Sequence, residues 1–72
     1  MSHREKLLDW FTRRKTITPF EAQYDLGIYR LSARIKQLRD DGHEIRTEIM
    51  TVATRDGGTA HPARYHYEGA PA

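Results

Sequence analysis

A chain of 72 residues is long enough for one small domain, and its lack of cysteine excludes disulfide bonds and thiolate zinc sites. The net charge of +2 is unevenly divided. Residues 1–42 carry nine Lys/Arg and six Asp/Glu, a net of +3, whereas residues 43–72 carry three and four, a net of −1. A basic first half favours a nucleic-acid partner, although a solvated surface of mixed charge accounts for the same balance.

Several classes of function are not expected from this sequence. No apolar run approaches the roughly 20 residues of a membrane span, and no N-terminal run resembles a signal peptide, so we expect a cytoplasmic protein without a membrane partner. No nucleophile–base arrangement, Gly-rich phosphate loop or metal-ligand spacing stands out. We therefore expect no enzyme activity, no cofactor, no metal and no small-molecule ligand.

The first predicted helix covers about residues 4–14. Ser2 with Glu5 forms a capping box. Its inner face is expected to hold Leu7, Leu8 and Phe11, with Trp10 at the edge. The following "KTI", residues 15–17, contains two β-branched residues and can form a brief strand.

The second predicted helix covers about residues 19–25. Thr18 is its cap, Pro19 takes the first helical position and Glu21 completes another capping box. Gly27 is well placed to end the helix in a left-handed conformation.

The side chains of this second helix divide between two faces. Ala22 and Leu26 share an inner face, while Phe20 and Tyr24 share the other side. This pattern predicts a helix that packs on both sides.

The third predicted helix covers about residues 29–41 and is the most amphipathic segment. Arg34 lies near its apolar edge, where we expect it to form a structural ion pair. The apolar stripe consists of Ile28, Leu31, Ile35 and Leu38. The opposite face carries Tyr29, Ala33, Lys36, Gln37 and Asp40, flanked by Arg30 and Ser32.

Residues 44–67 change to a period of two and predict a β-hairpin. Its turn is "RDGG", residues 55–58, and its second strand is expected to begin after Pro62. Tyr65 and Tyr67 alternate with charged residues and are expected to pack in the hairpin core. Residues 69–72 are expected to be a frayed tail.

The element order predicts an α+β fold in which two helices joined by a glycine turn form a helix-turn-helix unit and the hairpin forms a wing. The run "ITPFEAQYDLGIYRLSARIKQLRDDGHEI" followed by "ARYHY" resembles small winged helix-turn-helix proteins of phages and prophages. The resemblance covers about Arg4 to Tyr67. It implies a winged helix-turn-helix with three helices followed by a two-stranded β-hairpin wing and a short strand near residues 15–17. Residues 1–72 would form this single domain.

The sequence departs at one point from the compact helix-turn-helix of phage repressors. That pattern usually has alanine four residues before the turn glycine, whereas here Gln23 stands four before Gly27 and Ala22 five before. The winged variant is therefore the better match.

The resemblance implies that the helix over residues 29–41 is the recognition helix, placed in the DNA major groove, while the wing touches backbone or minor groove. Arg pairs bidentately with guanine and Gln with adenine, which suits the polar face of this helix. The candidates for base contacts are Tyr29, Arg30, Ala33, Lys36 and Gln37. The candidates for backbone contacts are Arg13, Arg14, Lys15, Thr18, Ser32 and Arg55. Any amphipathic helix also turns polar residues outward, and Arg13 and Arg14 equally suit the dipole of the first helix.

The expected function is a double-stranded DNA-binding module in the cytoplasm or nucleoid of a bacterial host. It would regulate transcription or assist recombination, as excisionase-type factors do, for a phage or mobile element. Such a module buries only roughly 600–1,000 Å² on DNA, which favours a homodimer or a cooperative array. The alternative is a protein–protein interaction domain that docks on a host or phage protein. Exposure of Phe20 and Tyr24 as an apolar patch would favour that alternative.

Overall fold

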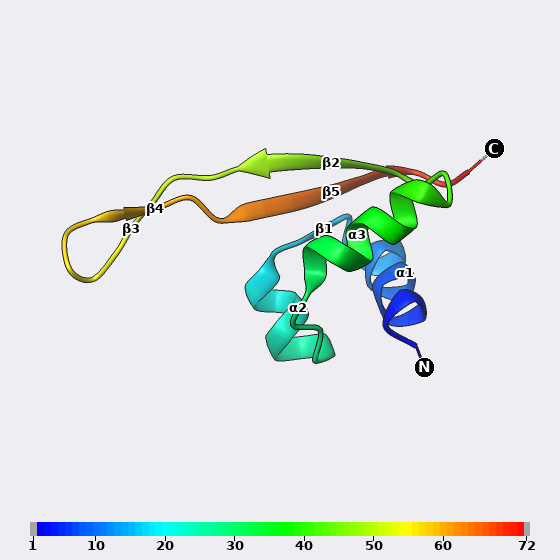
Figure 1. Ribbon diagram of the computed structural model, residues 1–72, viewed down its shortest axis with the longest axis horizontal. Coiled ribbons are helices and arrows are strands. Elements are labelled where there is room, and N and C mark those ends of the chain that lie inside the picture. Colours follow the sequence, from blue (N-terminus) through cyan, green and yellow to red (C-terminus); the bar gives the residue numbers. More distant parts are fainter. Residues whose placement is uncertain (1, 72) are drawn as a thin grey trace.

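The computed structural model describes residues 2–71, and three helices are followed by a long β-hairpin (Figure 1). A short strand between the first two helices joins the same sheet. In chain order the elements are α1 His3–Arg13, β1 Thr16–Ile17, α2 Pro19–Leu26, α3 Leu31–Asp40, β2 Glu44–Ile49, β3 Val52–Ala53, β4 Thr59–Ala60 and β5 Ala63–Gly69.

The hairpin forms one side of a small sheet and then projects away from the helices. The strand order is β1-β5-β2, with both pairs antiparallel, and β3 pairs with β4 at the far end of the hairpin (Figure 1). Pro62 has no N–H, which interrupts the second strand, but its carbonyl accepts a bond from Met50 N at 2.9 Å. The projecting hairpin makes the molecule elongated, with extents of 44 × 22 × 21 Å.

The core lies between the three helices and the inner face of the sheet. It consists of Leu7, Trp10, Phe11, Ile17, Ala22, Ile28, Leu31, Ile35, Leu38, Ile45 and Tyr65. Tyr67 packs against this core and stacks on Phe11, with ring centroids 5.0 Å apart. Its hydroxyl lies 2.8 Å from His43 Nδ1. The expectation that Tyr65 and Tyr67 belong to the hairpin core is confirmed.

The inner face of α1 differs from the expected one. The structure buries Trp10 in the core and leaves Leu8 half-buried, whereas the sequence pattern places Leu8 inside and Trp10 at the edge. The indole N–H of Trp10 donates to the carbonyl of Thr16 at 2.8 Å. That bond satisfies the N–H of the buried indole and holds the indole beside the first residue of β1.

Helix α2 begins and ends at the residues that signal it. The reciprocal capping box is present, with Glu21 N bonding to Thr18 Oγ1 at 3.2 Å and Thr18 N to Glu21 Oε1 at 3.0 Å. Gly27 has a φ of +70°, the left-handed conformation expected of it. The next amide, Ile28 N, donates to the Ala22 carbonyl at 2.9 Å, so the buried alanine lies directly under the turn.

The prediction that α2 packs on both sides is wrong. Phe20 and Tyr24 are 72% and 79% exposed. Only the Ala22 side of this two-turn helix is covered by α1 and α3, because the opposite side has no element against it within residues 2–71.

Helix α3 begins later than the sequence pattern suggests. Ile28 has the spacing of the apolar stripe but lies in the turn, where it is 1% exposed. Arg30 is the N-cap, with φ −119° and ψ 62°, and the first helical residue is Leu31. Tyr29 and Arg30 therefore belong to the turn. The Ile28 side chain reaches the core directly after the left-handed Gly27, so its burial does not require the helix to begin there.

Strand β5 extends to residue 69, the first residue of the expected tail. Gly69 is the last residue of β5 and pairs with Glu44. Pro71 lies against Gly42, where a Cβ would come within 3.1 Å of the proline ring. Ala72, the last residue of the expected tail, lies outside the described residues.

The fold class is as predicted: a small α+β domain of three helices followed by antiparallel strands, with a short strand at residues 16–17.

Candidate nucleic-acid interface

The expected base-contact residues come from two segments, the turn before α3 and the outer face of α3. Tyr29 and Arg30 are exposed in the turn, and Tyr29 is 76% exposed. Lys36 and Gln37 are exposed on the helix, while Ala33 is half-buried between them and the core. The structure thus presents the polar side chains outward, while Leu31, Ile35 and Leu38 anchor the opposite face.

Gln37 already has a partner on its own helix. Arg34 Nη1 donates to Gln37 Oε1 at 3.0 Å, in place of the structural ion pair expected for Arg34. This bond holds the Gln37 amide oxygen, and its NH₂ group remains a donor. A bidentate contact to adenine uses both groups, and the Gln37 oxygen, which has two lone pairs, would then be shared between Arg34 and the base.

The N-terminus of α3 is positive and lies beside the turn. The Arg30 carbonyl accepts from Ala33 N at 3.2 Å and from Arg34 N at 3.3 Å. Within residues 2–71, no side chain caps this end of the helix. The first amides of a helix point outward and carry the positive end of its dipole. Ser32 is exposed in the same first turn, and its hydroxyl is a further hydrogen-bond donor beside these amides.

The cations at the end of α1 are less available to a phosphate than their charge suggests. Arg13 forms an ion pair with Asp9, one turn earlier on α1. The Arg14 guanidinium lies over the Trp10 ring, 4.9 Å from its centroid. Lys15 is exposed, and its carbonyl accepts from Tyr67 N at 2.8 Å.

Thr18 is also partly committed. Its hydroxyl accepts from Glu21 N and donates to Glu21 Oε1 at 3.2 Å, and its side chain is half-buried. A phosphate at this helix start would have to compete with the Glu21 carboxylate.

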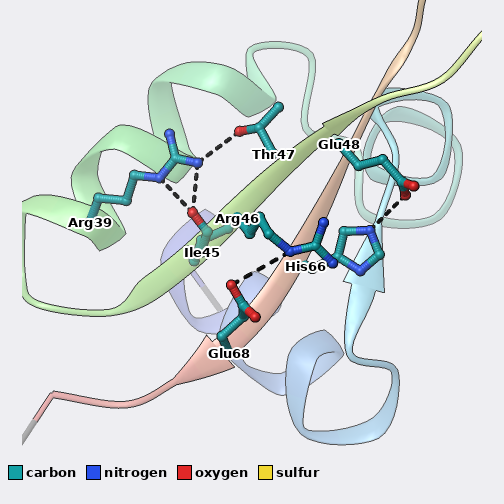
Figure 2. A network of polar contacts seen from close by, with 7 residues as sticks. All are labelled: Arg39, Ile45, Arg46, Thr47, Glu48, His66 and Glu68. Carbon is teal, nitrogen blue, oxygen red and sulfur yellow. Dashed lines mark hydrogen bonds and ion pairs between the residues drawn. The ribbon is translucent and has the colours of Figure 1, made fainter.

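Arg39 is a positioning residue that the sequence pattern did not single out. Its Nε and Nη2 donate to the Ile45 carbonyl at 3.0 and 2.7 Å, and Nη2 also donates to Thr47 Oγ1 at 2.8 Å (Figure 2). These bonds tie the last turn of α3 to β2. Arg39 stands one turn after buried Ile35, and that spacing was the available signal for a side chain turned toward the sheet.

The outer face of the sheet carries charges that compensate one another. His66 Nε2 lies 2.8 Å from Glu48 Oε1, and Arg46 Nε lies 3.7 Å from Glu68 Oε1 (Figure 2). The hydrogen bond from His66 is the main cause that lowers the pKa of Glu48 below 4.5, helped by the nearby Arg46 and Arg64 charges. Arg46 and His66 each contact a carboxylate, which weakens their attraction for phosphate, while Arg64 donates to Thr16 Oγ1 at 3.2 Å.

The tip of the hairpin is a tight turn that holds Arg55 outward. The Asp56 carboxylate accepts from the Thr54 hydroxyl and, at 3.2 Å, from Gly58 N. Gly57 has a φ of +85°, which a side chain would disfavour. The Thr54 hydroxyl and the Gly58 amide lower the pKa of Asp56 below 3.8. Arg55 is exposed at this tip, as expected.

The acidic end of α3 is partly neutralised. Asp41 pairs with Arg4 of α1, with Arg4 Nε 3.1 Å from the carboxylate. Asp40 is exposed. The exposed Asp40 makes this end of α3 less favourable for a polyanion than the segment from Arg30 to Gln37.

Comparison with known proteins gives one match. A family model described as a winged helix-turn-helix domain matches residues 2–67. Neither the curated proteins nor the solved structures yield a match. Within residues 2–71, no helix is both long enough and apolar enough to cross a membrane.

Proposed function

Because the chain belongs to the winged helix-turn-helix domain family, we propose that it is a binding module for double-stranded DNA. Helix α3 would enter the major groove, and the wing, residues 44–69, would follow the backbone or the minor groove. The observation that carries this proposal is the outer face of α3. It holds exposed Lys36 and Gln37, continues into exposed Arg30 and Tyr29, and is backed by a fully apolar inner face.

The residues fall into two proposed roles. Arg30, Lys36 and Gln37 would read bases, with Tyr29 and Ala33 making apolar or edge contacts beside them. Ser32, Thr18, Lys15 and Arg55 would bond phosphates and fix the register. Arg13 and Arg14 each have an intramolecular partner, so we assign them a general contribution to the positive potential.

The finer biological role rests on the resemblance to small proteins of phages and prophages. We propose transcription regulation or assistance to recombination, of the excisionase type, in the cytoplasm of a bacterial host. A single module buries roughly 600–1,000 Å² on DNA, and tight binding then needs a homodimer or a cooperative array.

The test is the double variant Arg30→Ala/Lys36→Ala. Each substitution should cost about 1–3 kcal/mol of binding if the side chain reads a base, and about one unit of salt slope if it contacts a phosphate. Binding is measured by fluorescence anisotropy, and the fold is checked by circular dichroism.

Arg46→Ala is the matched control. It removes one cation from the outer face of the sheet, where Arg46 faces Glu68. We expect its effect on binding to be small. If the double variant stays folded and binds DNA as the parent chain does, α3 is not the reading element.

A second candidate function is docking on another protein. The exposure of Phe20 and Tyr24 favours it, because two large aromatic side chains side by side are unusual on a surface that meets only water. The same DNA titration separates the two candidates, since a pure docking domain would not bind a duplex at low salt.

A further inference from the structure

Helix α2 presents an exposed aromatic pair. The rings of Phe20 and Tyr24 stack on each other, with centroids 5.5 Å apart and planes inclined by 13°. They are 72% and 79% exposed, so their mutual contact leaves most of both rings in water. Asp25 follows Tyr24, and α2 contains no Lys or Arg. We call Phe20, Tyr24 and Asp25 the aromatic patch, a surface that is both apolar and acidic.

The opposite chemistry lies at the end of α1. Trp10, Arg13 and Arg14 line an open hollow of about 210 Å³. This volume is below the roughly 300–1,000 Å³ of pockets that hold drug-sized ligands, and it suits a single side-chain ring. Arg14 already lies against the Trp10 ring, so the hollow offers a guanidinium and an aromatic edge together. We call these three residues the basic hollow.

We propose that the aromatic patch of one copy of this chain docks in the basic hollow of a second copy. An aromatic ring gains from contact with a guanidinium, and Asp25 would meet the charge of Arg14, since Arg13 is already paired with Asp9. Because the patch and the hollow are different surfaces of one chain, the contact can repeat from copy to copy. Neither surface includes α3 or the wing, so association leaves the two elements proposed to contact DNA accessible to a duplex.

The contact should be weak in free solution. Because the contact consists of one pair of side chains in a hollow of this size, we expect it to bury less than about 1,200 Å² in total. That is the small end of the range for protein–protein interfaces. Its effect on DNA, which rests on the proposed function, would be cooperative binding on duplexes long enough for two copies. Neighbouring copies on one duplex have a raised effective concentration.

The association is tested without DNA. Sedimentation equilibrium of the whole chain should show association that rises with concentration. Trp10 is the single tryptophan, so its emission and its access to acrylamide should change over the same concentrations. Phe20→Ser/Tyr24→Ser should weaken association by about tenfold or more, because aromatic anchors dominate small interfaces. The control Ile49→Thr removes an apolar side chain that is 63% exposed on β2 and should change nothing.

Charge-reversal variants test whether the aromatic patch of a second copy occupies the basic hollow. Asp25→Lys and Arg14→Glu should each weaken association, and the chain that carries both should recover it. Three results would overturn the proposal: a parent chain that stays monomeric, association that survives loss of both aromatic side chains, or association without any change at Trp10. A short duplex for one copy separates this from the DNA proposal, since Phe20→Ser/Tyr24→Ser should bind it as the parent does.

Discussion

Arg30 and Arg39 stand at opposite ends of α3 and have different surroundings. Arg30 is exposed at the N-terminal end, next to the outward-pointing amides of the first turn. Arg39 donates three hydrogen bonds to β2, so its guanidinium holds structure instead of offering charge. The same division holds between Lys36, which is exposed, and Arg34, which bonds Gln37. The exposed positive charge is therefore concentrated at Arg30 and Lys36, at the start and in the middle of α3.

Asp56 gives a prediction about pH at the wing tip. Its lowered pKa means that the folded turn favours the ionised carboxylate, through the Thr54 hydroxyl and the Gly58 amide. The stabilisation is present above the ordinary value of 3.8 and is lost as the pH falls through the lower pKa of the folded state. In an NMR titration, the Gly58 amide shift should follow a midpoint below 3.8. Asp56→Ala should abolish that titration, and a midpoint at or above the ordinary value would contradict the account.

At the scale of elements, α3 and the wing act as one unit through Arg39. Arg39→Met keeps the aliphatic stem but removes every donor to Ile45 and Thr47. We expect a loss of about 1 kcal/mol in stability, because these bonds lie near solvent, and a less fixed angle between α3 and β2. Residual dipolar couplings of the two elements measure that angle, and DNA affinity should fall with it.

The control for this prediction is Arg34→Met, which removes the same charge from the same helix. It should leave the angle between α3 and β2 unchanged, because the polar contact of the Arg34 side chain within residues 2–71 is with Gln37 of the same helix. Equal couplings in parent and Arg39→Met chains would show that packing alone orients the wing.

Capping and turn residues in the sequence predicted the start and end of α2 well. The Thr18 cap, Pro19, Glu21 and Gly27 fix α2 through hydrogen bonds within a few residues, so the sequence alone determines them. Periodicity was less reliable where the chain leaves the helix. Ile28 has the spacing of the α3 stripe, yet its side chain is buried from the turn. Trp10 is buried in the core, where its indole N–H donates to the carbonyl of Thr16.

The candidate site could be predicted only in part for the same reason. Which face of α3 points outward follows from its apolar stripe, but the partners of its cations depend on tertiary contacts. Arg39 meets β2 because of the fold, and Phe20 and Tyr24 are exposed because no element covers that side of α2 within residues 2–71. No short-range pattern carries that information.

At the scale of the whole molecule, shape and charge agree with a DNA-binding role. The wing extends the long dimension to 44 Å, and the turn between β3 and β4, to which Arg55 belongs, lies far from the helices (Figure 1). The net charge of +2 is modest, and Arg46 and His66 on the outer face of the sheet each contact a carboxylate. Attraction to a duplex must therefore come from the α3 face, the turn before it and the wing tip. That predicts few phosphate contacts and modest affinity for DNA of random sequence.

The most direct test is fluorescence anisotropy with a labelled duplex of random sequence, titrated at several salt concentrations. Each neutralised phosphate contributes about −0.9 to the slope of log affinity against log salt, so we predict a slope of about −3 to −6. Affinity should be in the micromolar range at low salt, since this is the sequence-independent part of binding. Absence of binding at low salt would contradict the central claim and leave docking on a protein as the function of this fold.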